Sequence, residues 1–183
     1  MKEYLYCIVG RSGSGKDTIA DMVCHIKNMK KVLSCTTRIP RNEKDYKNHK
    51  FLTVNDYMTA KENDEIVADT YFNENYYWTT KQQLNDADFY IIDIAGLKKL
   101  KELYNNKQLV TVFIQCDRDN CKQRMLNRGD SWKAVEKRLK NDDLMFQEAL
   151  DFSWDLIIDN STAHSKSAYS LLVDLIERKE RGK

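Results

Sequence analysis

A glycine-rich segment near the N-terminus is the first stretch whose residue types could do chemistry. It reads Gly10-Arg11-Ser12-Gly13-Ser14-Gly15-Lys16-Asp17-Thr18, and it holds three of the six glycines of the chain. Glycines let consecutive backbone N–H groups point at a phosphate without side-chain obstruction. A helix that begins near Lys16 adds partial positive charge, and the lysine ammonium can reach the outer phosphates. The segment therefore predicts a phosphate-binding loop of the Walker A type.

Thr18 and Asp93 are candidates for holding Mg²⁺ beside this loop. The strict pattern has Ser or Thr directly after the lysine, whereas here Asp17 comes first and Thr18 follows. Asp93 lies in the apolar run Phe89–Ile94, where an acidic group at the end of a buried strand can hold Mg²⁺ through water. The alternative for Asp93 is a solvated loop aspartate, and whether Asp17 touches the metal stays open.

A pair of arginines in a polar segment forms a second candidate anion site. Arg38 and Arg41 are three residues apart and flank Pro40, the sole proline of the chain. Proline makes its neighbourhood extended and stiff, so the two guanidinium groups can present their forks to one phosphate. The alternative is a solvated basic loop.

The elements that must position these residues alternate along the chain. Short apolar runs at Tyr4–Val9, Phe89–Ile94, Leu109–Gln115 and Leu156–Ile158 predict buried strands. Helical periods predict helices at Lys16–Met29, Leu97–Tyr104, Arg118–Asn127, Trp132–Leu150 and His164–Arg178. Strands that alternate with such helices indicate an α/β fold with a parallel sheet. Residues 36–81 are polar and rich in Tyr and Asn, and we expect an irregular, smaller lobe there.

Composition limits the class of protein and its partners. A net charge of +2 over 183 residues gives no general case for a nucleic-acid or membrane partner. The five cysteines form no C-x-x-C pair, which argues against a disulfide scaffold or a zinc site. No apolar run is long enough for a signal peptide or a membrane span. We therefore expect a cytoplasmic protein whose oligomeric state the sequence leaves open.

Several further motifs, in order along nearly the whole chain, resemble those of the guanylate kinases. Ser34–Glu43 is similar to the T-T-R-x-P-R signature of that family, and Asn75–Thr80 to its N-Y-Y-G-S/T stretch. Ile91–Gly96 resembles its I-L-D-I strand and turn, and Arg124–Gly129 its R-L-x-x-R-G lid entry. Lys137–Leu139 resembles the K-R-L of the helix that follows the lid entry. Asp155–Asn160 is like its closing D-x-V-I-x-N strand.

The resemblance implies a P-loop NTPase three-layer α/β fold in one domain over residues 1–183. The core would span 1–35 and 82–183, the nucleoside-monophosphate lobe about 36–81, and the lid about 128–135. ATP and Mg²⁺ would be the co-substrate and cofactor, and small-molecule nucleotides the only partners. The residues implied at the ATP site are Gly10, Arg11, Ser12, Gly13, Ser14, Gly15, Lys16, Asp17, Thr18 and Asn160, with Lys16, Arg124, Arg128 and Arg138 catalytic. Those implied at the acceptor site are Ser34, Arg38, Arg41, His49, Asp69, Tyr77 and Thr79.

Three departures from the family pattern concern the base of the acceptor. A gapless match places Ala68 where the family has an acidic guanine reader, and Asp69 could replace it only through a local slip. The turn at Asp93 is about two residues short, so a second acidic reader falls in the gap. Trp78 replaces a small glycine and would tighten the base pocket or give it a stacking face. The resemblance implies phosphorylation of GMP or dGMP. The three departures leave another or a broader base specificity as the alternative.

Two other functions remain open. One is a non-catalytic interaction module of the same fold, which would commonly have lost the loop glycines or the lysine, whereas Gly15 and Lys16 are intact. The other is a P-loop kinase for a metabolite that is not a nucleotide. It would leave Thr36–Arg41 and Asn75–Tyr77 unexplained.

Overall fold

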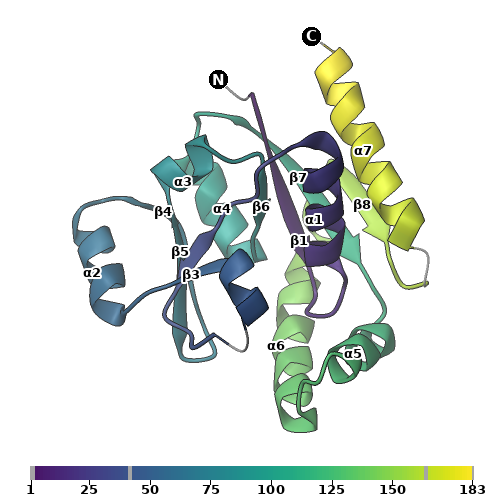
Figure 1. Ribbon diagram of the computed structural model, residues 1–183, viewed down its shortest axis with the longest axis horizontal. Coiled ribbons are helices and arrows are strands. Elements are labelled where there is room, and N and C mark those ends of the chain that lie inside the picture. Colours follow the sequence, from purple (N-terminus) through teal and green to yellow (C-terminus); the bar gives the residue numbers. More distant parts are fainter. Residues whose placement is uncertain (1–2, 41–42, 163–164, 183) are drawn as a thin grey trace. The chain divides into compact units, whose positions relative to one another are not determined.

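The computed structural model describes residues 3–40, 43–162 and 165–182 (Figure 1). The chain folds as two compact units, of which the first comprises Met1–Tyr6 and Lys30–Leu109. The second comprises Cys7–Met29 and Val110–Lys183. Two strands, β1 (Tyr4–Gly10) and β7 (Gln108–Gln115), begin in the first unit and end in the second. Each unit is described by itself below.

The first unit contains most of the strands. Its elements between the two split strands are β2 (Ser34–Thr36), the 3-10 helix η1 (Glu43–Lys47), β3 (His49–Phe51), α2 (Val54–Glu62), β4 (Ile66–Phe72), β5 (Asn75–Thr80), α3 (Lys81–Asn85), β6 (Phe89–Ile91) and α4 (Ile94–Leu103). β6 lies beside the start of β1, where Tyr6 N–H donates to Asp88 O at 2.8 Å. Four of the other strands form a sheet in the order β3-β2-β5-β4.

The β4–β5 hairpin has two chemically different faces. The strands are antiparallel, and Asp69 lies opposite Trp78 whereas Thr70 lies opposite Tyr77. Opposed residues share a face and successive residues alternate between faces. We call the two sides the α2 face (Asp69, Tyr76 and Trp78) and the Tyr77 face (Ala68, Thr70, Tyr77 and Thr79).

The α2 face is covered by the helix for which it is named. Tyr57 of α2 stacks on Tyr76 with ring centroids 4.1 Å apart and meets Trp78 edge-on at 5.3 Å. Trp78 is 2% exposed and forms one core cluster with Cys35, Tyr57 and Ala60. Large aromatic rings of this kind each bury much apolar area, so this face supplies a core for the lobe.

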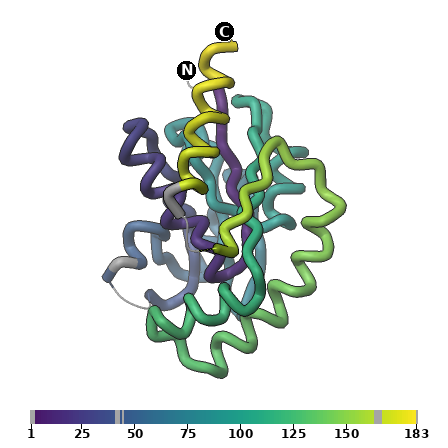
Figure 2. Tube along the Cα trace, turned by 90° about the vertical axis from the view of Figure 1, so that its right-hand side faces the viewer, coloured from purple at the N-terminus to yellow at the C-terminus, as the bar shows by residue number. Residues whose placement is uncertain are grey.

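The second unit contains α1 (Lys16–Lys27), α5 (Arg118–Asn127), α6 (Trp132–Leu150), β8 (Leu156–Asp159) and α7 (Ser165–Arg181). The end of β1, then β7, then β8 lie side by side, and β7 and β8 run parallel with Ile114 opposite Ile158. α1 lies along α7, and α5 lies against α6 (Figure 2). A buried cluster of Cys116, Cys121, Met125, Val135 and Leu139 joins α5 and α6.

The observed elements confirm the expected α/β fold with a central parallel sheet. The described part of the chain holds the expected helices within a few residues of the predicted bounds. The expectation that residues 36–81 are irregular is wrong, because three strands and α2 form there. In the described residues, no helix has the length and apolar character that a bilayer crossing requires.

Candidate active site

Two glycines give the phosphate-binding loop its shape. Gly15 caps α1 with a φ of 89° and Gly13 has a φ of 80°. These left-handed values strain residues that carry a Cβ. Space excludes a side chain as well, because a Cβ on Gly13 would lie 2.4 Å from Cys121 O and one on Gly15 would lie 2.6 Å from Asn160 Nδ2. The loop is thus built from main chain, with backbone N–H groups as its anion-binding surface.

Two side chains hold the middle of the loop through one carbonyl. Asn160 Nδ2 donates to Ser14 O at 2.8 Å, and Arg124 Nη1 donates to the same oxygen at 3.3 Å. Arg124 Nη2 also donates to Asn160 O at 2.8 Å. Both residues were expected at the ATP site, and the structure brings both to the loop. Asn160 Oδ1 is buried without a hydrogen-bond donor among the described residues, so it could accept from a ligand.

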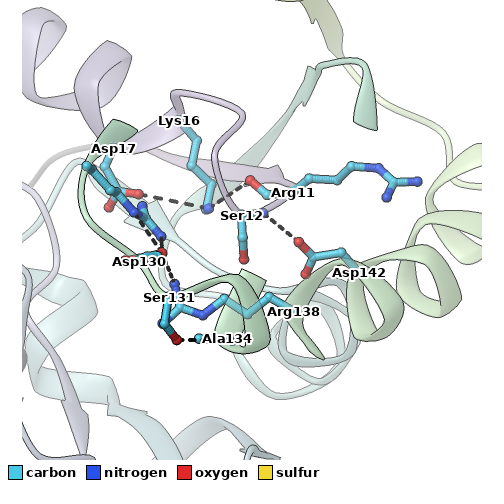
Figure 3. A network of polar contacts seen from close by, with 10 residues as sticks. Arg11, Ser12, Lys16, Asp17, Asp130, Ser131, Ala134, Arg138 and Asp142 are labelled. Carbon is cyan, nitrogen blue, oxygen red and sulfur yellow. Dashed lines mark hydrogen bonds and ion pairs between the residues drawn. The ribbon is translucent and has the colours of Figure 1, made fainter. Parts of the chain in front are cut away.

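Lys16 curls back over the loop that it follows (Figure 3). Its Nζ donates to Arg11 O at 3.3 Å and lies 3.9 Å from a carboxylate oxygen of Asp17. The ammonium is therefore held at the loop by weak contacts, from which it can turn to a phosphate at small cost.

The two expected lid arginines meet on one carboxylate. Arg128 Nη2 lies 2.6 Å and Arg138 Nη1 2.8 Å from the same oxygen of Asp130 (Figure 3). Ser131 caps α6 through a bond from Ala134 N–H, which fixes the turn that carries Asp130. Asp130 and Arg138 are largely buried, with side chains 14% and 16% exposed. This turn thus concentrates two positive charges next to one negative charge.

Helix α6 also sends carboxylates to the phosphate-binding loop. Ser12 N–H donates to Asp142 Oδ2 at 2.7 Å (Figure 3). The neighbouring Asp143 pairs with Arg11 and with Arg118 Nε, the latter at 3.1 Å. The guanidinium of Arg11 lies 4.1 Å from the ring centroid of Phe146. The Arg11 side chain is therefore held by α6, and only its backbone faces the loop that was expected to bind the nucleotide.

In the first unit, three expected acceptor residues lie together. Ser34 Oγ and His49 Nδ1 are 3.0 Å apart, and the rings of His49 and Tyr77 meet edge-on at 5.8 Å. Thr79 lies on the same face of β5 as Tyr77. It is fully buried, and its hydroxyl donates to Tyr90 OH at 2.7 Å. The cluster offers hydroxyl and imidazole groups to an anion.

Arg38 is the described member of the expected arginine pair. Its Nη1 donates to Asp45 Oδ2 at 2.8 Å and to Ile39 O at 3.0 Å, and its guanidinium lies 5.2 Å from the ring centroid of Phe51. Its Nε is buried without an acceptor among the described residues. A donor without an acceptor in a buried site is a ready contact for a phosphate oxygen. Arg41 lies outside the described residues.

Asp69 cannot act as the expected acceptor ligand, because it lies on the α2 face. Its carboxylate accepts from Tyr57 OH at 2.7 Å and from Lys99 Nζ at 2.6 Å. Burial acts to raise the pKa of Asp69, but the bonds from Lys99 and Tyr57 outweigh it and hold the pKa below its usual value. The hairpin has a register shift between Ile66 and Ala68, but from Ala68 opposite Thr79 onward the pairing is regular and leaves Asp69 on the α2 face.

The expectation that Trp78 shapes the base pocket is also wrong. It belongs to the α2 face and fills the core against Tyr57, on the other side of the strand from Tyr77 and Thr79. The replacement of a small glycine by Trp78 is therefore a matter of core packing in the lobe.

Asp93 caps α4 within the first unit. Its Oδ1 accepts from Gly96 N–H at 2.7 Å. Burial raises the pKa of Asp93 above its usual value, although hydrogen bonds from Gly96, Thr70 and Ala95 oppose that rise. Thr70 belongs to the Tyr77 face, so Asp93 presents its carboxylate beside the acceptor residues of this unit.

Sequence reasoning missed the carboxylates that hold the basic groups of the site. Two of them are near their partners in the sequence: Asp45 is 7 positions from Arg38, and Asp130 is 2 positions from Arg128. The other two are distant: Asp142 is 130 positions from Ser12, and Asp143 is 132 positions from Arg11. The first two are near enough for a charge-pair search to find them. The other two lie on an ordinary polar helix face, and no local signal marks them.

The guanylate kinase family model matches residues 2–179. The guanylate kinase of Mesomycoplasma hyopneumoniae strain 7448 is 37% identical over 123 residues, and the match covers 60% of this chain and 62% of that protein. The chain thus spans about three fifths of the length of this relative. The guanylate kinase of Fusobacterium nucleatum is 25% identical over 181 residues, covering 94% and 95% of the two chains.

A solved structure supports the same fold. The crystal structure of guanylate kinase from Anaplasma phagocytophilum superposes with a TM-score of 0.73 at 19% sequence identity. The superposition covers 97% of this chain and 86% of that chain. At this level of identity the similarity concerns the fold alone.

Proposed function

Because the chain belongs to the guanylate kinase family, we propose that it transfers the terminal phosphate of ATP to a nucleoside monophosphate, with GMP or dGMP as the leading acceptor. The observation that carries this proposal is the phosphate-binding loop. Left-handed Gly13 and Gly15 expose backbone N–H groups, and Lys16 lies over them. A non-catalytic module has no need of this strained geometry or of the lysine.

The donor half would work mainly by alignment and charge. Phosphoryl transfer needs little covalent work from the protein, because the reacting oxygens must be in line and the equatorial oxygens neutralised. Lys16 would contact the outer phosphates, and Arg128 and Arg138 would leave Asp130 for the transferred group. Arg124 is already bonded to Ser14 O, so we assign it the role of holding the loop.

The acceptor half would bind the monophosphate through the Ser34, His49 and Tyr77 cluster and Arg38. The buried Nε of Arg38 supplies one donor, and Arg41 would supply a second guanidinium by resemblance to the family. Thr79 would support the face behind Tyr77. The attacking atom is already an anionic phosphate oxygen, so no strong general base is required. Among the described residues of this cluster, His49 is the one histidine, so no pair of histidines is available for general acid–base catalysis.

Mg²⁺ fits a site in which the nucleotide supplies most of the ligands. The described residues contain no group of three or more His, Cys, Asp or Glu side chains that could hold a metal. Mg²⁺ commonly keeps several waters and binds phosphates with one or two protein groups. By resemblance to the family, the hydroxyl of Thr18 and the carboxylate of Asp93 would serve as those groups. When bound with ATP, Mg²⁺ neutralises charge on the β- and γ-phosphates.

A broader base specificity is the second candidate, and the Tyr77 face favours it. The position of the expected acidic reader is Ala68, which is buried and apolar. A site that lacks a hydrogen-bond partner for the base discriminates by shape, which is worth about 1–3 kcal/mol. A cytoplasmic location is also part of the proposal, because the five cysteines form no C-x-x-C pair and show no paired spacing of a disulfide scaffold.

The test is a panel of ribo- and deoxyribonucleoside monophosphates with Mg·ATP, with both nucleotide products separated by chromatography. We expect ADP and a diphosphate of the acceptor in equal amounts, with GMP or dGMP the best substrate. Lys16→Ala should slow product formation by about 10²–10³-fold, whereas Lys27→Ala, at the other end of α1, should not. ATP binding without transfer to any monophosphate would favour the interaction module. ADP formed without an acceptor product would contradict the assignment.

A further inference from the structure

A carboxylate of α6 lies on the loop that is built to bind phosphate. Asp142 Oδ2 accepts the Ser12 N–H at 2.7 Å, and Figure 3 shows this side chain reaching from the helix to the loop. A contact of this length between a carboxylate and an N–H is a charge-assisted hydrogen bond. One of the N–H donors of the loop is thus already bonded to an anion that belongs to the protein.

The neighbouring contacts explain why Asp142 stays there. Arg11, the residue before Ser12, is held from α6 by Asp143 and by the face of Phe146, and its side chain is 11% exposed. Asp143 is itself shared with Arg118 of α5. These contacts do not involve the Asp142 side chain. They fix the start of the loop against α6, so that Asp142 and the Ser12 N–H face each other.

The negative charge of Asp142 opposes the binding of an anionic ligand at the loop. The N-terminus of α1, Lys16 and the consecutive loop N–H groups together favour an anionic ligand. ATP brings several negative charges into this region, and a carboxylate bonded to the loop repels them. Asp142 is partly buried, so solvent screens this repulsion less than it would at the surface.

We propose that Asp142 is an internal competitor for the donor nucleotide: its carboxylate occupies the Ser12 N–H, and ATP must displace it to bind the loop fully. The inference rests on the proposed function, because it takes the loop to be the ATP site. Asp142 then sets the affinity for ATP below the value that the same loop would reach without it. Asp143 acts differently, as a positioning residue that holds Arg11.

The test compares full-length variants by calorimetric titration with Mg·ATP, with no acceptor present. Asp142→Asn keeps the shape and an acceptor oxygen but removes the charge. We expect it to bind ATP about 5- to 10-fold more tightly, equivalent to about 1–1.4 kcal/mol. Asp142→Ser, which is too short to reach the loop, should give the same gain. The matched control is Asp151→Asn, an exposed position at the end of the same helix, where no change is expected.

Asp143→Asn separates competition from support of the loop. It leaves the Ser12 contact in place but weakens the hold on Arg11, so ATP should bind more weakly. Unchanged or weaker ATP binding by both Asp142 variants, with unchanged melting temperatures, would overturn the inference. Absence of ATP binding by every variant would overturn it too. Failure of the proposed function looks different: ATP would bind, with the same order among variants, yet no monophosphate would be phosphorylated.

Discussion

Replacement of Asp69 by alanine distinguishes a structural carboxylate from a base reader. The side chain lies on the α2 face and joins Tyr57 of α2 to Lys99 of α4. If this geometry is right, the variant loses stability and keeps its choice of acceptor. If Asp69 reads the base, the variant keeps its stability and loses that choice. The two measurements are independent, so one variant decides between the two roles.

The expected loss of stability follows from the two bonds. Tyr57 is 2% exposed, and its hydroxyl loses its bond to a charged acceptor, which costs about 1.5–3 kcal/mol. Lys99 is about half exposed at its side chain, so its pair with Asp69 adds only about 0.5 kcal/mol. We expect a total of about 2–3.5 kcal/mol. For a chain of 183 residues this lowers the melting temperature by about 4–14 °C.

The stability lost in Asp69→Ala should depend on pH. The pKa of Asp69 is lower in the folded protein than its usual value, so its contribution is fully present above about pH 4. It is lost as the pH falls through the lowered folded pKa. The stability difference between the native protein and Asp69→Ala should therefore be constant from pH 7 to about pH 4.5 and shrink below that.

The assay pairs thermal melts with initial rates on the preferred monophosphate. We expect kcat/KM for that acceptor to stay within about twofold of the native value. Glu62→Ala, at an exposed carboxylate of α2, serves as the control and should change neither quantity. Loss of the acceptor preference with an unchanged melting temperature would refute the face assignment. That result would indicate that Asp69 contacts the base of the acceptor.

Three other variants test the remaining parts of the molecule. Lys16→Ala should lower kcat by about 10²–10³-fold with an unchanged melting temperature, and Lys16→Arg should recover little; near-native turnover would remove Lys16 from the mechanism. Arg38→Ala should raise the KM for the monophosphate about 10- to 150-fold and leave that for ATP unchanged, whereas equal effects on both would place Arg38 elsewhere. Lys107→Met should destabilise the fold by about 2–4 kcal/mol in urea titrations, because the buried Nζ donates to Leu84 O and Ala87 O; a cost below about 1 kcal/mol would contradict this.

The phosphate-binding loop was predictable because its causes are local. Strand, glycines, lysine and helix follow one another within residues 4–27, and the observed φ values at Gly13 and Gly15 are those that the pattern requires. The long helices were predictable for the same reason, since a buried stripe such as Val135 and Leu139 repeats with the helical period.

The lobe was harder to predict because both faces of its hairpin carry aromatic or polar residues. A strand with one apolar face shows clear alternation, whereas Asn75–Thr80 has Tyr76 and Trp78 on one side and Tyr77 and Thr79 on the other. Alternation within this segment would nevertheless have separated Trp78 from Tyr77, but the expectation for Trp78 did not apply it. Applied to β4, the same rule places Asp69 away from Ala68.

The carboxylates that bond to the expected phosphate-binding groups share one physical logic, although only the distant one, Asp142, was beyond prediction from the sequence. Arg38 bonds to Asp45, the lid arginines bond to Asp130, and one loop N–H bonds to Asp142. A partly buried guanidinium without an anion is costly, so a phosphate site needs a resident counter-charge during the part of each cycle when its ligand has left. Such a carboxylate stabilises the fold and weakens the binding of the ligand by related amounts, because both effects come from the same bond. Under the proposed function, the affinity of each of these groups for phosphate would be set as much by the carboxylate that the phosphate displaces as by the group that receives it.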